Sequence, residues 1–291
     1  MNSNAGARGA SAGSKLTLEQ VLDRANRLPS PPGLVADLIA SLEDDGARLD
    51  DLAERIGRDQ AIAAKVLRLA NSAFYGMAGK VASLVQASVV LGQRNLRSLA
   101  IGAGVIAPFA GLKGAPYDLS QFWRHSVGVA AAARALATEC GENVEFAFTA
   151  GLLHDIGRLV LVAGFPDAYA EVLRERAATD SYLIDAEREH LGLDHALVGA
   201  ALAQRWRFPE PIRVAVAEHH DLPENAAKLS CLVQCADVLA IALDFGNSPE
   251  ALVPPLAAQA WNQLELTWET LPSLLPEVDR LYAGASELFA N

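Results

Sequence analysis

The stretch Thr149-Ala150-Gly151-Leu152-Leu153-His154-Asp155-Ile156-Gly157 places a histidine and an aspartate side by side at the end of an apolar run. The apolar positions before this pair predict a buried helix that ends just before Gly157. Adjacent residues on a helix point about 100° apart, but the geometry loosens at a helix end. We therefore expect His154 and Asp155 to approach one metal ion together.

Further histidines and an aspartate occur along the rest of the second half in similar surroundings. Their helical neighbours three and four positions away are small or apolar, so these polar side chains lie on stripes that face a core. A buried carboxylate needs a partner, and imidazole and carboxylate are usual ligands of Fe, Mn or Zn. A hydrogen-bonded histidine cluster is the simpler alternative. The candidate metal ligands are His125, His154, Asp155, His195, His219, His220 and Asp237.

A metal at this place would support Lewis-acid hydrolysis of a phosphate ester. If the protein is an enzyme, Asp155 and Arg158 are the residues that we expect to take part. Arg124, Arg158 and Lys228 are near enough in sequence to contact a phosphate. Solvated surface charge is an equally good interpretation of these three cations.

The composition limits the classes of partner. The chain has 291 residues, of which 51% are hydrophobic, and a formal net charge of −11. Such an acidic chain is a poor general binder of nucleic acid or of an anionic membrane. We find no signal peptide and no uncharged apolar run of transmembrane length, and we expect a cytoplasmic protein. The three cysteines, Cys140, Cys231 and Cys235, indicate buried apolar side chains and no disulfide framework.

Helical periodicity dominates the chain, and no alternating strand pattern is convincing, so we predict an all-α fold. Glycine and proline between Pro108 and Tyr117 mark the boundary between two helical halves. In the second half we expect helices at about 144–155, 166–179, 181–190, 194–206, 209–220 and 226–244. The predicted organisation is a disordered lead-in over 1–15, an N-terminal helical lobe over 16–112, a helical bundle over 117–245 and a C-terminal extension over 246–291.

Residues 50–71 resemble a DNA-reading helix-turn-helix. The segment carries four acidic and four basic residues, so it lacks the positive charge that DNA binding requires. Two packed helices of a bundle are the favoured interpretation.

The motifs as a set resemble the HDOD family. His125, His154-Asp155 and Asp237 match the pattern of the HD superfamily of metal-dependent phosphohydrolases. The segments that resemble HDOD proteins are Leu28-Pro29, 70–76, Leu91-Gly92, 192–195, 198–200, Trp206, Pro209 and His219-His220. The resemblance implies a helical lobe packed on an HD-like helical bundle, and a role in bacterial signal transduction. HDOD proteins are generally regarded as regulatory.

The sister HD-GYP family, which hydrolyses cyclic di-GMP with bound metals, uses the same seven ligand positions. This chain differs from it in two places. Asp221-Leu222-Pro223 follows the histidine pair where that family has a glutamate and a Gly-Tyr-Pro loop, and Arg158 replaces a lysine. Arginine binds phosphate but is not equivalent to lysine.

Two functions follow as expectations. The first is a regulatory module that acts through a signalling protein partner or a bound ligand, with a possible divalent metal in the HD-like lobe. The alternative is a metal-dependent phosphohydrolase that acts on a nucleotide or cyclic dinucleotide. We favour the first, because the motifs of the first half carry no evident chemistry.

Overall fold

Helices make up the ordered secondary structure of the computed structural model, which describes residues 15–25, 33–41, 49–71, 81–106, 109, 118–246 and 252–286. No strand occurs within these ranges, and the all-α prediction is confirmed. The predicted lead-in and most of the predicted boundary over 108–117 lie outside the described residues.

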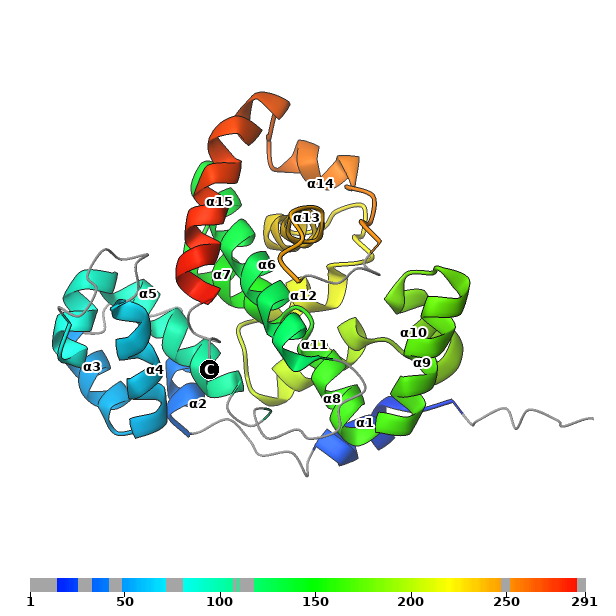
Figure 1. Ribbon diagram of the computed structural model, residues 1–291, viewed down its shortest axis with the longest axis horizontal. Coiled ribbons are helices and arrows are strands. Elements are labelled where there is room, and N and C mark those ends of the chain that lie inside the picture. The colour runs from blue at the N-terminus through cyan, green and yellow to red at the C-terminus, as the bar shows by residue number, and fades with distance from the viewer. Residues whose placement is uncertain are drawn as a thin grey trace, which may run out of the picture.

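The first half forms a small helical lobe at one end of the molecule (Figure 1). Its helices are α2 (Gly33–Ala40), α3 (Leu49–Gly57), α4 (Gln60–Ala70) and α5 (Leu84–Ile106). Gly92 has φ 74° and ψ 160°, so α5 consists of two helical pieces. Both α3 and α4 pack on α5 through buried residues such as Ile56 and Val66. Residues 50–71 are therefore part of a helical bundle, which is the interpretation that we favoured over a DNA-reading motif.

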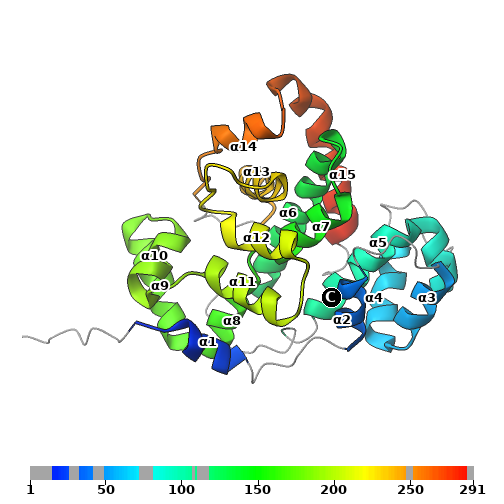
Figure 2. The same cartoon turned by 180° about the vertical axis from the view of Figure 1, so that it is seen from behind.

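Helix α1 (Leu18–Ala25) lies apart from the helices that follow it in the chain. It packs on the second half, against α8 (Ile156–Gly164) and α11 (His195–Arg205) (Figure 2). The Leu16 backbone N–H also donates to the Leu191 carbonyl at 2.8 Å. Helix α1 thus packs on the second half, although it precedes the first lobe in sequence.

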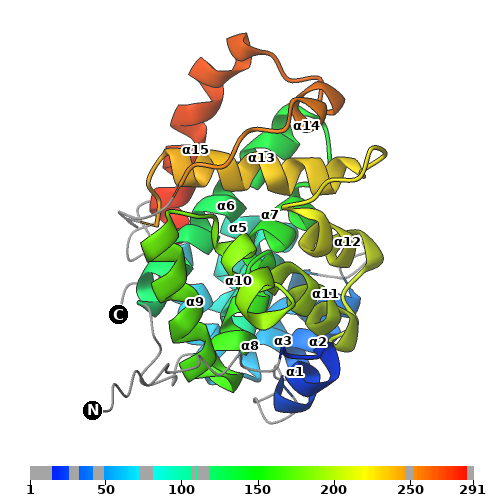
Figure 3. The same ribbon diagram turned by 90° about the vertical axis from the view of Figure 1, so that its right-hand side faces the viewer.

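The second half is organised around one long central helix. Helix α6 (Leu119–Glu139) buries a row of alanines from Ala130 to Ala133, together with Ala135 and Ala137. Side chains this small let α7, α13 and α15 pack closely on α6 (Figure 3). The remaining helices of this half are α7 (Val144–Leu153), α9 (Pro166–Thr179), α10 (Leu183–Leu191), α12 (Glu210–Glu218) and α13 (Lys228–Ala242).

Among the described residues, the segment Val144–Gly164 is long and apolar enough to cross a membrane by length and composition alone. Of its apolar window, 83% is buried inside the molecule. The segment is also broken by a turn at His154-Asp155 into α7 and α8. Our expectation that the helix ends before Gly157 missed α8, because Gly157 lies within its first turn.

The C-terminal extension returns to the centre of the molecule. Residues 252–257 are non-helical and precede α14 (Ala258–Gln263), a short 3-10 helix (Trp268–Thr270) and α15 (Leu271–Ser286). Helix α15 packs on α6, and α14 packs on α13. Trp261, Leu274 and Val278 are buried there in a second hydrophobic cluster with α6 and α13.

A buried ion pair joins the two lobes. Arg97 of α5 donates from Nε to Glu145 Oε1 at 2.5 Å and from Nη2 to Oε2 at 2.7 Å, and its Nη1 donates to the Ser41 carbonyl. The two charged side chains are 1% and 2% exposed. Glu145 lies in the first turn of α7, the helix that ends at His154. We call this Arg97–Glu145 pair the clamp. It connects the first lobe to the helix that leads into the candidate site.

Glu145→Ala should destabilise the fold strongly. The substitution leaves the buried Arg97 guanidinium without its carboxylate, and we expect the free energy of unfolding to fall by about 3–5 kcal/mol. Urea titration followed by circular dichroism measures this change. Glu54→Ala is the matched control, because the exposed Glu54–Arg58 pair should contribute little. Equal losses in the two variants would contradict the role given to the clamp.

Candidate metal centre

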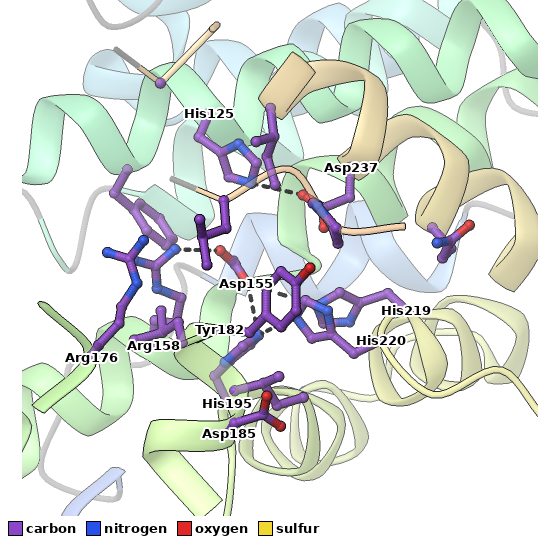
Figure 4. Close-up of a pocket in the computed structure, with 18 of the residues that line it drawn as sticks. His125, Asp155, Arg158, Arg176, Tyr182, Asp185, His195, His219, His220 and Asp237 are labelled. Carbon is purple, nitrogen blue, oxygen red and sulfur yellow. Dashed lines mark hydrogen bonds and ion pairs between the residues drawn. The ribbon is translucent and has the colours of Figure 1, made fainter. Parts of the chain in front are cut away.

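Five separate parts of the second half supply the seven candidate ligands, all of which except His154 are labelled in Figure 4. One comes from within α6, two from the turn between α7 and α8, one from the start of α11, two from the end of α12 and one from within α13. The structure brings all seven side chains to one place. In chain order they are His125, His154, Asp155, His195, His219, His220 and Asp237.

A close approach of two backbones sets part of this geometry. A Cβ atom on Gly157 would lie 2.0 Å from the His195 carbonyl oxygen and 2.6 Å from the Gly199 nitrogen. Any side chain at Gly157 would therefore push α8 away from α11. The glycine keeps Asp155, just before α8, next to His195, the first residue of α11.

The ligand atoms form two adjacent groups. In the first, Asp155, His195, His219 and His220 each offer one atom, and these atoms all lie within 4.8 Å of one another. The second group, within the same limit, consists of His125, His154 and Asp237. Each group has the size and the donor chemistry of a binding position for one divalent ion.

Asp155 lies between the two groups. Its Oδ1 is 3.1 Å from His195 Nε2, 3.6 Å from His154 Nε2 and 3.8 Å from His219 Nε2. The other oxygen, Oδ2, accepts from Arg158 Nη1 at 2.7 Å. We expected His154 and Asp155 to approach one ion together. They fall instead in neighbouring groups, and Asp155 of the first group also lies close to His154 of the second.

Hydrogen bonds behind the rings aim the imidazoles at this space. His154 Nδ1 lies 2.7 Å from the Gly151 carbonyl, and His219 Nδ1 lies 2.8 Å from the Val216 carbonyl. A carbonyl only accepts, so each Nδ1 carries the proton, and in the neutral ring Nε2 keeps a lone pair. Metal-binding histidines in proteins are held in the same way.

Two further observations indicate that these seven residues can hold a metal ion. His219 Nε2 is buried and has no hydrogen-bond partner, and leaving a buried lone pair unsatisfied is costly. In addition, two pairs of Nε2 atoms face each other, His125 with His154 at 3.3 Å and His195 with His220 at 2.9 Å. A cation among these nitrogens and the carboxylates would satisfy all of them.

The charge states of the group favour cation binding at neutral pH. Burial alone would raise the pKa of Asp155, but His154, Arg158 and His195 outweigh it and hold that pKa well below its usual range. The pKa of Asp237 is also lowered against its burial, chiefly by His125. Burial lowers the pKa of His154 to about 4 and that of His220 to about 2. Both carboxylates are therefore ionised, and these two imidazoles are neutral.

The pKa of His195 shifts in the opposite direction to those of His154 and His220. Burial would lower its pKa, but the charges of Glu187 and Asp155 raise it to about 10. Glu187 is completely buried in α10, and its Oε2 lies 2.6 Å from His195 Nδ1. Sequence reasoning missed this residue. A glutamate between Ile184 and Leu191, both buried on the same helix face, was the signal that could have identified it.

An open cavity of about 540 Å³ lies over the metal centre. Arg158, Arg176 and Tyr182 line it on the side of α8 to α10, as Figure 4 shows. Arg158 also lies over the Phe122 ring, 5.7 Å from the centroid. Leu252, Pro254 and Pro255 from the C-terminal extension line another part of the wall. This size is typical of a pocket for a small molecule.

The three cations considered as phosphate contacts lie in different places. Arg124 and Lys228 do not line the cavity, and Lys228 Nζ instead pairs with Glu142 Oε1 at 3.0 Å. Arg158 does line the cavity, and Arg176 was not predicted. The cysteines take no part in either ligand group among the described residues, in agreement with their interpretation as core side chains.

Asp155→Ala should remove bound metal, because Asp155 faces both ligand groups. Elemental analysis of protein purified without chelator or histidine tag should find one or two equivalents of Fe, Mn or Zn in the wild type and a loss of at least one in the variant. Asp185→Ala is the control, since Asp185 lines the cavity outside both groups. A folded wild type without metal would instead indicate a hydrogen-bonded histidine cluster.

Metal affinity should rise with pH. The pKa of His195 in the metal-free protein is about 10, so a proton must leave this ring before it can act as a ligand through Nε2. Below that pH we expect the affinity to rise by about tenfold per pH unit, with one proton released per ion. Isothermal titration with Mn²⁺ at pH 7.5, in two buffers of different ionisation enthalpy, counts this proton. Equal heats in the two buffers would contradict the prediction.

Comparison with known proteins places this geometry in a family. The HDOD domain model matches residues 28–222. A solved structure of an HDOD-domain protein of unknown function from Geobacter sulfurreducens is 26% identical, with a TM-score of 0.80 over 94% of this chain and 98% of that chain. Another, from Shewanella amazonensis and provisionally named a phosphohydrolase, is 28% identical, with a TM-score of 0.75 over 93% of this chain and 98% of that one.

Curated relatives extend beyond this chain. A protein of Treponema pallidum is 28% identical over 266 residues, which cover 87% of this chain and 50% of the relative. Ribonuclease Y of Thermus thermophilus is 36% identical over 120 residues, which cover 41% of this chain and 16% of that enzyme. The chain therefore spans half or less of the length of these relatives. The matched family model, which includes six of the seven candidate ligands, shows that this chain belongs to the HDOD domain family.

Proposed function

We propose that the protein is a bacterial, cytoplasmic signal-transduction module whose HD-like lobe binds divalent metal and, above it, a phosphate-containing ligand such as a nucleotide or cyclic dinucleotide. Its bound state would be passed to a signalling protein partner. The buried, unpartnered His219 Nε2 among six other convergent ligands, at the floor of an open cavity, carries this proposal.

The charge of the cavity supports an anionic ligand once metal is bound. Among the described residues that line the cavity there are five aspartates and three arginines, so the net charge of this lining is negative even with His195 protonated. One divalent ion balances this excess, and a second makes the lining positive. Opposite charge in a partly enclosed cavity raises the local concentration of a ligand. Metal loading therefore converts a cavity that repels phosphate into one that attracts it.

Arg158 is the residue best placed to connect the metal centre and the ligand. One side of its guanidinium binds Asp155 Oδ2, and the side chain is partly exposed in the cavity. A guanidinium presents five donors in a planar fork, so Arg158 can hold Asp155 and still reach a phosphate oxygen. Arg176, from the neighbouring helix α9, adds a second positive charge on the same wall.

Hydrolysis of the bound phosphate ester is the second candidate function. The position of Asp155 between two adjacent ligand groups favours it, since hydrolytic two-metal sites hold their ions close together. When bound, a metal pair supplies Lewis acidity that polarises a phosphate ester and activates water. In that case Arg158 would orient the ester, and Asp155 would keep the two positions in register. Binding without turnover remains our first candidate, because Asp221-Leu222-Pro223 offers no recognisable substrate-reading loop.

Ligand binding should require metal and Arg158. We expect the Mn²⁺-loaded protein to bind cyclic di-GMP or GMP in isothermal titration and the chelator-stripped protein to bind neither. Arg158→Ala should weaken binding about 10- to 100-fold, through loss of a hydrogen bond between charged groups. Arg174→Ala is the control, because Arg174 lies on α9, outside the cavity, and pairs with Glu171. Equal affinity in loaded and stripped protein would contradict the proposal.

Turnover separates the two candidate functions. Protein loaded with Mn, Fe or Zn should be incubated with bis(4-nitrophenyl) phosphate and with the same nucleotides. Release of 4-nitrophenol that disappears in Asp155→Ala and persists in Asp185→Ala would establish the phosphohydrolase. Binding without release under all three metals would favour the regulatory module.

A further inference from the structure

The two ligand groups differ in the partner that contacts Nδ1 of their imidazoles, on the side of the ring away from the candidate metal positions. Behind His154 and His219 there are neutral backbone carbonyls of the preceding helical turn. Behind His195 there is a full carboxylate, that of Glu187, at 2.6 Å from Nδ1. His195 belongs to the group of Asp155, His219 and His220, so only this group has a negative charge directly behind one of its rings among the described contacts.

Hydrogen bonds to both of its carboxylate oxygens fix the Glu187 side chain against His195. Its Oε2 also accepts the His195 backbone N–H at 2.8 Å, at the first residue of α11, and its Oε1 accepts the Tyr169 hydroxyl at 2.7 Å. The side chain is completely buried. No arginine or lysine pairs with Glu187 in the part of the chain that the structure describes. Its charge is therefore directed at His195 and, through that ring, at the first ligand group.

We propose that Glu187 makes the two metal positions unequal: the position of Asp155, His195, His219 and His220 binds tightly and fills first, and that of His125, His154 and Asp237 is weak. This inference rests on the proposed metal binding. Glu187 is a positioning residue, because it acts on the metal only through His195.

Two physical differences between the groups support this order. A carboxylate behind an imidazole fixes the ring and makes its other nitrogen a stronger donor. The first group also offers four ligand atoms, and the second offers three. The cavity would gain its net positive charge only when free metal is abundant enough to fill that position.

The test is isothermal titration of the chelator-stripped protein with Mn²⁺ alone. The wild type should show two separate binding events. Glu187→Gln keeps the shape of the side chain and removes its charge. With the affinities corrected for the proton that His195 releases, it should weaken the tight event about 10- to 100-fold and leave the weak one within about threefold. Tyr169→Phe is the matched control, since it removes one hydrogen bond to Glu187 and keeps the charge. It should change both events by less than about threefold.

Two ligand variants test the order of filling without altering Glu187. His220→Ala should abolish the tight event, and His125→Ala should abolish the weak one. Two equal events in the wild type, or equal weakening of both events by Glu187→Gln, would overturn the inference and leave the proposed function intact. A wild type that binds no Mn²⁺ would overturn both. A lower melting temperature of Glu187→Gln with an unchanged ratio of the two affinities would show that Glu187 is only structural.

Discussion

The site depends on one buried carboxylate. Asp155 Oδ1 lies within 4 Å of the Nε2 atoms of His154, His195 and His219, which come from both groups. A carboxylate buried to this extent is tolerated only when cations or strong donors surround it. Arg158 provides one positive charge, and the imidazoles provide the remaining polar contacts. The demand for positive charge around Asp155 makes a metal ion the natural complement of this cluster.

The scaffold brings this carboxylate into place through backbone contacts rather than through the ligands themselves. The absence of a side chain at Gly157 allows α8 to touch α11, and the alanines of α6 allow α7 and α13 to approach it. Helix α7 then connects two polar features. Glu145 at its start is clamped by Arg97 of the first lobe, and His154 at its end is a candidate ligand. The lobe contact and the metal centre are thus separated by one helix of ten residues.

The sequence predicted more of the site than of its surroundings. Histidines and aspartates on apolar stripes identified all seven side chains that converge, because burying such groups without a shared partner is unfavourable. The break at His154-Asp155 was recognised, but α8 was missed, since Gly157 is read as a helix end when the helix it packs against is unknown. Glu187 and Arg176 were missed for a related reason. Their roles depend on contacts between α9, α10 and α11, which no local pattern contains.

The same charge distribution would couple metal binding at the candidate centre to binding of a phosphate ligand in the cavity. Without metal, the acidic lining of the cavity disfavours a phosphate, and Arg158 is engaged by Asp155. If ions filled both positions, they would share Asp155 with Arg158, and the guanidinium would have more capacity for an external anion. Metal and ligand would then bind cooperatively, since each reduces the electrostatic penalty of the other, and this coupling is reciprocal. The occupancy of such a cavity would depend on both the metal and the phosphate ligand. This coupling is useful in a regulatory module whether or not the ligand is cleaved.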